Sequence, residues 1–263
     1  MKTRTIYICL ALLLTAFSVH AKTVIKEFKK TVDFRPNGTV YIRNNNGNIE
    51  LESWENDYVD IYAEIIVRDK DDREAQDLLD EIQIKIEESG DRISIVPEYS
   101  SRTSSNNFWD WIFGSNSPPV INFKVKVPLE TSPELESMNG NIMIENIRGV
   151  TKAGTLNGGI RLYRMQGSVD AHTTNGSIEA MLISTDRDDD VQIKTINGSI
   201  IVSLSEDIAA YIKASTINGG IETDLPLTIK GKILKKNIEA SLNGGGGHIS
   251  LSTVNGGIRI NKH

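Results

Sequence analysis

The chain has 263 residues, of which 39% are apolar and 24% charged, so it can build a core and is not an intrinsically disordered protein. Aromatic residues make up only 6%, and the core must therefore rely on aliphatic side chains. The 35 acidic residues outnumber the 29 basic ones, and an acidic surface repels phosphate backbones, which argues against nucleic acid as a partner.

Residues 1–21 have the features of a secretory signal peptide. Lys2 and Arg4 make a basic start, residues 6–17 are an apolar run, and Val19 and Ala21 place small side chains before a cleavage point. A membrane anchor is the alternative, but the run is shorter than the ~20 residues of a spanning helix. We therefore expect an exported, extracytoplasmic protein that is periplasmic, surface-bound or released.

Cleavage after Ala21 would remove two basic residues and the only cysteine, Cys9. The mature chain would then have a net charge of −8 and neither disulfides nor thiol chemistry, although its compartment would permit disulfides. Its stability is expected to come from burial and hydrogen bonding.

The segment 22–130 predicts a β-rich cap with one short helix. Ala75, Leu78 and Leu79 recur at helical spacing, and the aspartates ahead of them suit a helix N-terminus. Alternating apolar and polar residues predict strands, and a hairpin turn is expected at 89–91. The expected elements are strands at 58–67, 82–86, 92–96 and 121–127 and a helix at 69–80.

The segment 100–119 is rich in serine and asparagine but contains a dense group of aromatic residues. Phe108, Trp109, Trp111 and Phe113 are candidate partner-binding residues, because amphipathic aromatics suit a protein partner or a membrane interface. Membrane contact is expected through this loop only, and the acidic chain argues against anionic lipid. The alternative is that these side chains fold back onto the cap or the flank of the repeats.

The sequence Asn-Gly-x-Ile recurs along the chain, and such self-similarity is typical of repeat folds. From Asn139 the spacing is 18, 18, 22 and 21 residues, and half-copies at Gly149 and Gly167 give a finer period of nine. One earlier copy stands at Asn46, and a degenerate copy lies at 246–251. The predicted structural turns are Asn139-Gly140, Asn157-Gly158, Asn175-Gly176, Asn197-Gly198, Asn218-Gly219 and Asn255-Gly256.

Each copy combines a tight turn with a half-buried strand. Glycine reaches positive φ without steric cost and asparagine is the next most tolerant residue, so Asn-Gly favours a turn. The isoleucine and the residue two positions on are usually apolar, whereas the residue between them, such as Arg161, is usually polar. A meander of hairpins is the competing arrangement. The constant register favours stacked turns, with isoleucine on isoleucine and strands about 4.8 Å apart.

We therefore predict an all-β fold, a right-handed parallel β-helix or solenoid with Asn-Gly turns over residues 131–263. The cap at 22–130, β-rich and containing one short helix, would cover its open end, which would otherwise be a template for aggregation. The asparagines are expected to form amide ladders between stacked turns, and a glycan-binding ridge along them is the alternative.

The order of these elements resembles the putative-adhesin β-strand-repeat family of bacterial envelope proteins, a family with a domain of unknown function. The matching residues are 75–86, 90–96, Val125-Lys126-Val127-Pro128 and the Asn-Gly-x-Ile series from Asn139. The resemblance implies a bacterial source, a location outside the cytoplasm and the β-strand-repeat fold. It brings no catalytic motif with it.

Neither a metal site nor a cofactor is expected. The acidic segment 185–190 offers hard oxygen ligands but lacks the glycine and distal glutamate of a calcium loop, and an insertion loop is the better interpretation. His172 and His248 have no second histidine at ligand spacing, so neither zinc binding nor general-base catalysis is predicted for them.

The predicted function is that of a non-catalytic envelope protein, adhesin-like or structural, whose partner is an envelope protein or a glycan. An accessory role beside an envelope sensor is one alternative. The other is a polysaccharide-acting β-helix enzyme, for which Glu179 and Glu222 in equivalent outward positions on adjacent rungs are the candidate carboxylates. Arg161 and Arg259 fill the same position in other copies, which favours a solvated face instead.

Overall fold

The computed structural model describes residues 22–69, 72–99, 118–226, 228–229 and 236–263. Two β-sheets face each other across one aliphatic core, and a single helix, α1 (Asp72–Glu81), lies at one end. The strands of sheet A are β1 (Lys22–Asp33), β3 (Ile49–Trp54), β4 (Tyr58–Asp69), β7 (Val120–Pro128), β9 (Ile142–Glu145), β11 (Ile160–Gln166), β13 (Ile178–Ser184), β15 (Ile200–Leu204), β17 (Ile221–Thr223) and β21 (Ile258–Lys262). The strands of sheet B are β2 (Thr39–Asn46), β5 (Ile82–Ser89), β6 (Arg92–Tyr99), β8 (Ser132–Asn139), β10 (Thr151–Asn157), β12 (Val169–Asn175), β14 (Asp190–Asn197), β16 (Ala210–Asn218), β18 (Thr228–Ile229), β19 (Asn237–Leu242) and β20 (Gly247–Asn255).

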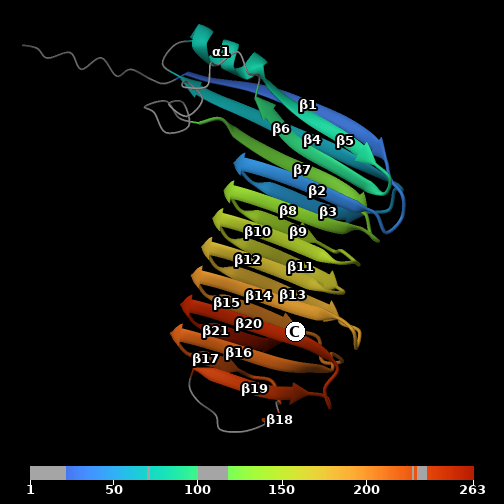
Figure 1. The fold of residues 1–263 in the computed structure, drawn as a ribbon, viewed down its shortest axis with the longest axis vertical. Coiled ribbons are helices and arrows are strands. Elements are labelled where there is room, and N and C mark those ends of the chain that lie inside the picture. Colours follow the sequence, from blue (N-terminus) through green and yellow to red (C-terminus); the bar gives the residue numbers. More distant parts are fainter. Residues whose placement is uncertain (1–21, 70–71, 100–117, 227, 230–235) are drawn as a thin grey trace, which may run out of the picture.

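The repeats wind into a parallel coil, as predicted, and not into a meander. Each rung consists of a strand of sheet B, an Asn-Gly turn and the next strand of sheet A, and rungs stack along the long axis of Figure 1. Neighbouring rungs are in register, so that Ile160 pairs with Ile178 and Ile178 with Ile200. These isoleucines are buried, which confirms the predicted stacking of isoleucine on isoleucine.

Alternation along each strand separates the core from the outer faces. In β15, Ile200, Val202 and Leu204 are fully buried, whereas Ile201 and Ser203 between them are half-buried. The finer nine-residue period corresponds to one strand and one turn, because the half-copy turns near Gly149 and Gly167 return the chain from sheet A to sheet B.

The rungs do not stack in chain order. At the lower end, β20 lies between β14 and β16, and β21 lies between β15 and β17, so the last rung along the chain is an internal rung of the stack. At the upper end, β2 and β3 lie between the rung of β6 and β7 and the rung of β8 and β9. Residues 39–54 therefore form a rung of the coil although they precede residue 131.

The upper end is covered by antiparallel strands and by α1 (Figure 1). β1 pairs with β4 over twelve residues, β4 pairs with β7, and β5 pairs with β6, all antiparallel. Ala75 and Leu79 of α1 are buried in the core, as their helical spacing predicts. The helix begins at Asp72 and not at Asp69, because β4 continues to Asp69. At the lower end, β19 covers the edge of β16 in the antiparallel direction.

Candidate interaction surface

The Asn-Gly turns stack along one edge of the coil, which we call the asparagine edge. Each asparagine donates a hydrogen bond from Nδ2 to Oδ1 of the asparagine one rung nearer the helix-covered end, at 2.7–2.9 Å. All six links point in the same direction, so the amide dipoles align and strengthen one another. The ladder runs through Asn46, Asn139, Asn157, Asn175, Asn197, Asn255 and Asn218.

Close stacking explains why glycine follows each asparagine. A Cβ atom on Gly176 would overlap the carbonyl oxygen of Gly158, and the other turn glycines face the rung beside them in the same way. We expected positive φ to be the reason, but among the turn glycines it occurs only at Gly47, with φ 112°, and at Gly158, with φ 156°. The expectation was incomplete, since the neighbouring backbone restricts these positions more than the turn conformation does.

A buried threonine two residues before the asparagine completes the turn. The Thr173 hydroxyl donates to the Gly158 carbonyl of the adjacent rung at 2.9 Å. Equivalent bonds are made by Thr155, Thr195, Thr216 and Thr253. In the first rung Asn44 replaces the threonine and donates to the Gly47 and Ile121 carbonyls. Sequence reasoning missed this position, although Thr-x-Asn-Gly is visible in five copies.

Thr173→Val is expected to cost about 1–2 kcal/mol of unfolding free energy, because it leaves a buried carbonyl without its donor at nearly constant volume. Thr174→Val is the matched control, since Thr174 is half-buried on the outer face, and its effect should stay within about 0.5 kcal/mol. Urea denaturation followed by circular dichroism measures both. Equal effects of the two variants would contradict the assigned role of Thr173.

An exposed apolar stripe runs along sheet B beside the ladder, and we call it the apolar ridge. Its members stand one residue before each asparagine, and because the flanking residues pair in register, they form one line. The exposed fractions are 44% for Leu156, 47% for Ile196 and 60% for Ile217. The ridge comprises Met138, Leu156, Thr174, Ile196, Val254 and Ile217.

A shallow groove of about 420 Å³ lies on the other side of the ladder, on sheet A. Small or amide side chains after the turn, such as Asn141, Gly159 and Ser177, form part of its lining. Met143 and Ile201, which break the polar pattern of the repeat, also line it. The asparagine edge therefore presents a saturated amide ladder between an apolar ridge and a mixed groove.

Glu179 and Glu222, the two carboxylates that the sequence suggests for an enzyme, do not lie close together on the outer face of sheet A. β15 and β21 lie between the strands of Glu179 and Glu222, so three ladder steps of about 4.8 Å separate these residues by about 14 Å. The expectation that they lie on adjacent rungs is wrong, because the rungs are not stacked in chain order. Glu179 instead pairs with Arg161 at 3.5 Å and Glu222 with Arg259 at 3.0 Å.

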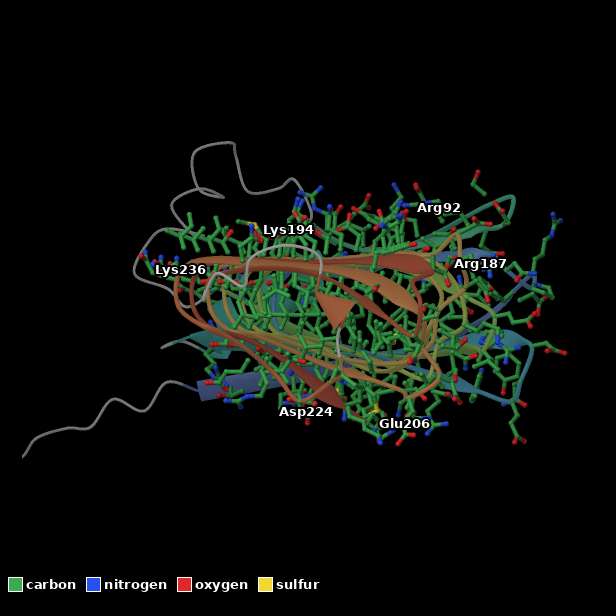
Figure 2. All side chains as sticks on the ribbon, turned by 90° about the horizontal axis from the view of Figure 1, so that it is seen from below. Arg92, Arg187, Lys194, Glu206, Asp224 and Lys236 are labelled. Atoms are coloured by element: carbon green, nitrogen blue, oxygen red, sulfur yellow. The ribbon has the colours of Figure 1, made fainter. Side chains whose placement is uncertain are left out.

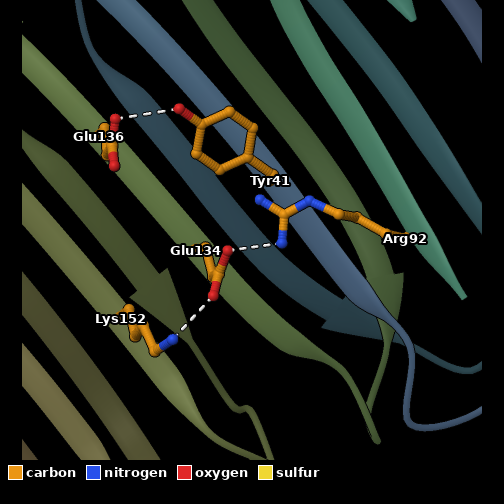
Figure 3. Close-up of polar contacts among 5 residues, drawn as sticks. All are labelled: Tyr41, Arg92, Glu134, Glu136 and Lys152. Carbon is orange, nitrogen blue, oxygen red and sulfur yellow. Dashed lines mark hydrogen bonds and ion pairs between the residues drawn. The ribbon is translucent and has the colours of Figure 1, made fainter. Parts of the chain in front are cut away.

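A charged network on sheet B connects four successive strands near the upper end (Figure 3). Glu134 accepts from Arg92 Nη1 at 2.6 Å and from Lys152 Nζ at 2.9 Å. The Tyr41 hydroxyl donates to Glu136 at 3.0 Å, and the Arg92 guanidinium lies 4.7 Å from the centre of the Tyr41 ring. The hydrogen bonds from Lys152 and Arg92 lower the pKa of the Glu134 carboxyl.

The Glu134 network is expected to make stability depend on acidity. The pKa of Glu134 is lower in the folded protein than in the unfolded chain. Its contribution to the free energy of unfolding is therefore complete above the pKa of the unfolded chain, and it is lost as the pH falls through the pKa of the folded protein. Glu134→Gln should cost a few tenths of a kcal/mol at neutral pH and should flatten the acid limb of the stability curve. Denaturation midpoints measured against pH test this, and an effect that persists in 1 M salt would contradict it.

The remaining predicted sites are placed as follows. Phe108, Trp109, Trp111 and Phe113 lie outside the described residues. The segment 185–190 contains a turn in which Asp189 accepts from the Asp186 amide and the Ser168 hydroxyl. Among the described residues, no group of three histidine, cysteine or carboxylate side chains is arranged to bind a metal ion, and no helix there is long and apolar enough to span a bilayer.

Comparisons with known proteins place this chain in a family. Similar solved structures include a "putative cell adhesion protein" from Clostridium sporogenes, with 16% identity, a TM-score of 0.47 and coverage of 91% of this chain and 100% of that one. A second is a "putative adhesin" from Bacteroides fragilis, with 10% identity, a TM-score of 0.38 and coverage of 90% of this chain and 97% of that one. A third is a "putative lipid binding protein" from Parabacteroides distasonis, with 10% identity, a TM-score of 0.30 and coverage of 90% of this chain and 96% of that one. A search of curated proteins finds no match. A family model described as Toastrack DUF4097 matches residues 17–261, and this chain therefore belongs to the Toastrack family of β-strand-repeat proteins.

Proposed function

We propose that this chain is a non-catalytic, exported protein of the bacterial cell envelope that binds a partner along the asparagine edge. The observation that carries the proposal is the apolar ridge, a line of exposed and half-buried side chains on a regular stack that is apolar at every member except Thr174. Large exposed apolar patches on folded proteins mark interaction sites. The partner is an envelope protein or a glycan, and the aromatic residues 108–113 are proposed as a second contact.

The regular backbone supports this role. Ladder hydrogen bonds and a fully buried aliphatic core hold every rung, so the ridge is presented without the cost of ordering a flexible segment. The sequence of residues 1–21 supports export, and the names of similar structures, two of them adhesion proteins, agree with an envelope location. The separation of Glu179 from Glu222 argues against the carboxylate pair that the sequence suggested for glycan cleavage.

Site-specific crosslinking in the native envelope tests the proposal. A photoreactive amino acid at Leu156 or Ile196 should give a discrete adduct with an envelope protein or glycan. The same residue at Val150, which is 49% exposed at the opposite edge of sheet B, should not. Absence of adducts from both ridge positions in mature, exported protein would contradict the proposal. Turnover of an envelope polysaccharide that is lost in Glu179→Gln would contradict the non-catalytic assignment.

A further inference from the structure

We infer that the lower half of the apolar ridge, Ile196, Val254 and Ile217, docks an amphipathic α-helix whose apolar face is flanked by carboxylates. The inference rests on the proposed function and specifies the partner of that same surface.

The three side chains form one continuous contact line. Asn197 pairs with Asn255 and Asn255 with Asn218, so the residues just before them project side by side from β14, β20 and β16. Ile196 is 47% exposed and Ile217 60% exposed, and Val254 between them is half-buried. Unlike the upper half, which includes Thr174, this half consists only of β-branched aliphatic residues.

The charges nearest to this line are positive, although the protein is acidic. Lys194 stands on the same outer face two residues before Ile196, and its cross-strand neighbours are His172 and Ser252. At the other end, Lys236 Nζ donates to the Ile217 carbonyl at 2.7 Å. Figure 2 shows both lysines on the same side of the molecule. On the opposite flank lies the uncharged amide ladder. Complementary charge on a partner is therefore negative.

The shape of the ridge fits a helix better than a second copy of this chain. Rungs repeat every ~4.8 Å and helix turns every ~5.4 Å, so apolar residues at i, i+4 and i+7 of a helix can follow three rungs with little mismatch. The whole ridge spans five steps, about 24 Å, but is only one side chain wide. A stable dimer needs about 800 Å² from each partner, which so narrow a stripe does not supply.

Two labelled peptides test the inference on the mature protein. One is an 18-residue helix-forming peptide with a leucine face flanked by glutamates, and the other has lysines in place of the glutamates. Fluorescence anisotropy should show the acidic peptide binding at least about tenfold more tightly, and this preference should weaken with salt. Ile196→Asp should weaken acidic-peptide binding about tenfold, Lys194→Glu should abolish the preference, and Val150→Asp should change neither.

Several outcomes would overturn the inference. They are equal binding of the two peptides, binding insensitive to Ile196→Asp, and binding that appears only after deletion of 100–117. The inference would also be overturned if sedimentation showed a dimer that Ile196→Asp dissociates. Binding of the protein to phosphatidylglycerol vesicles that is lost in Ile196→Asp would overturn it as well. If neither peptide binds while the photoreactive residue at Ile196 still captures an envelope component, the helix inference fails and the proposed function stands. If both fail, the proposed function fails too.

Discussion

Replacing Gly176 with alanine is expected to lower the free energy of unfolding by about 3 kcal/mol. The new Cβ atom would overlap the Gly158 carbonyl oxygen, which is backbone and cannot rotate away. The two rungs must therefore separate at the asparagine edge. Separation weakens the bond from the Gly158 amide to the Asn175 carbonyl, the bond from the Thr173 hydroxyl to the Gly158 carbonyl and the amide link from Asn175 to Asn157. Urea denaturation followed by circular dichroism measures the loss.

Gly220→Ala is the matched control for Gly176→Ala. Gly220 belongs to the same repeat motif, but a Cβ atom there meets no other atom within 4 Å, and its φ is not in the left-handed region. The free energy of unfolding of Gly220→Ala should stay within about 0.5 kcal/mol of that of the unchanged protein. If both glycine variants lose similar stability, the contact between rungs is not the cause, and the lower entropy of the unfolded alanine chain cannot explain the loss because it favours the folded state.

Ending the chain after Gly246 is expected to detach the entire lower end of the coil. β20 and β21 supply the parallel partners of β16 and β17, so their removal leaves residues 210–242 without ladder hydrogen bonds to the stack. Amide hydrogen exchange should show that β16 and β19 lose nearly all protection, because the remaining ribbon of β16, β19 and the two-residue β18 has lost the stack on which its apolar face packs. Strands β8 to β13 should remain protected, since each rung is held by its own neighbours.

A chain ending after Leu204 is the comparison for this truncation. It lacks the lower end completely, and its remaining rungs should match those of the chain ending after Gly246 in protection and in denaturation midpoint. Persistent protection of Ile212 and Ala214 without β20 would show that the lower end folds by itself or pairs directly with β14, and either result would contradict the role assigned to the internal rung.

The sequence predicts the coil because local patterns and global structure agree at each copy. Isoleucine alternation, the turn residues and the fixed register all select the same stacked arrangement, and α1 follows from the spacing of Ala75 and Leu79. The order of the rungs is not predictable in this way. The turns at Asn218 and Asn255 have the same local chemistry, and nothing in either copy specifies which one lies against Asn197.

Long-range connections decide that order. β18 and β19 pair with each other after β17, and the chain rejoins the stack at Gly247. The Asn255 copy therefore enters between the rung of Asn197 and the rung of Asn218. The copy at Asn46 likewise pairs with Asn139, which lies 93 positions later in the chain. The apolar ridge escaped sequence reasoning for a different reason. Its members follow a buried threonine or, at Met138, a buried serine at one position per rung, and the line they form exists only after stacking.

The amide ladder has a consequence for chemical ageing. Asparagine followed by glycine is the pair most open to deamidation, because the glycine nitrogen can attack the side-chain carbonyl and close a five-membered imide. In the coil, the Gly176 nitrogen donates to the Asn197 carbonyl, and the Asn175 amide is fixed by bonds on both sides. Neither group is free to reach the reactive geometry. In six of the seven Asn-Gly pairs of the ladder the glycine nitrogen is bonded across rungs in this way, so the stacking that organises the turns also slows their deamidation.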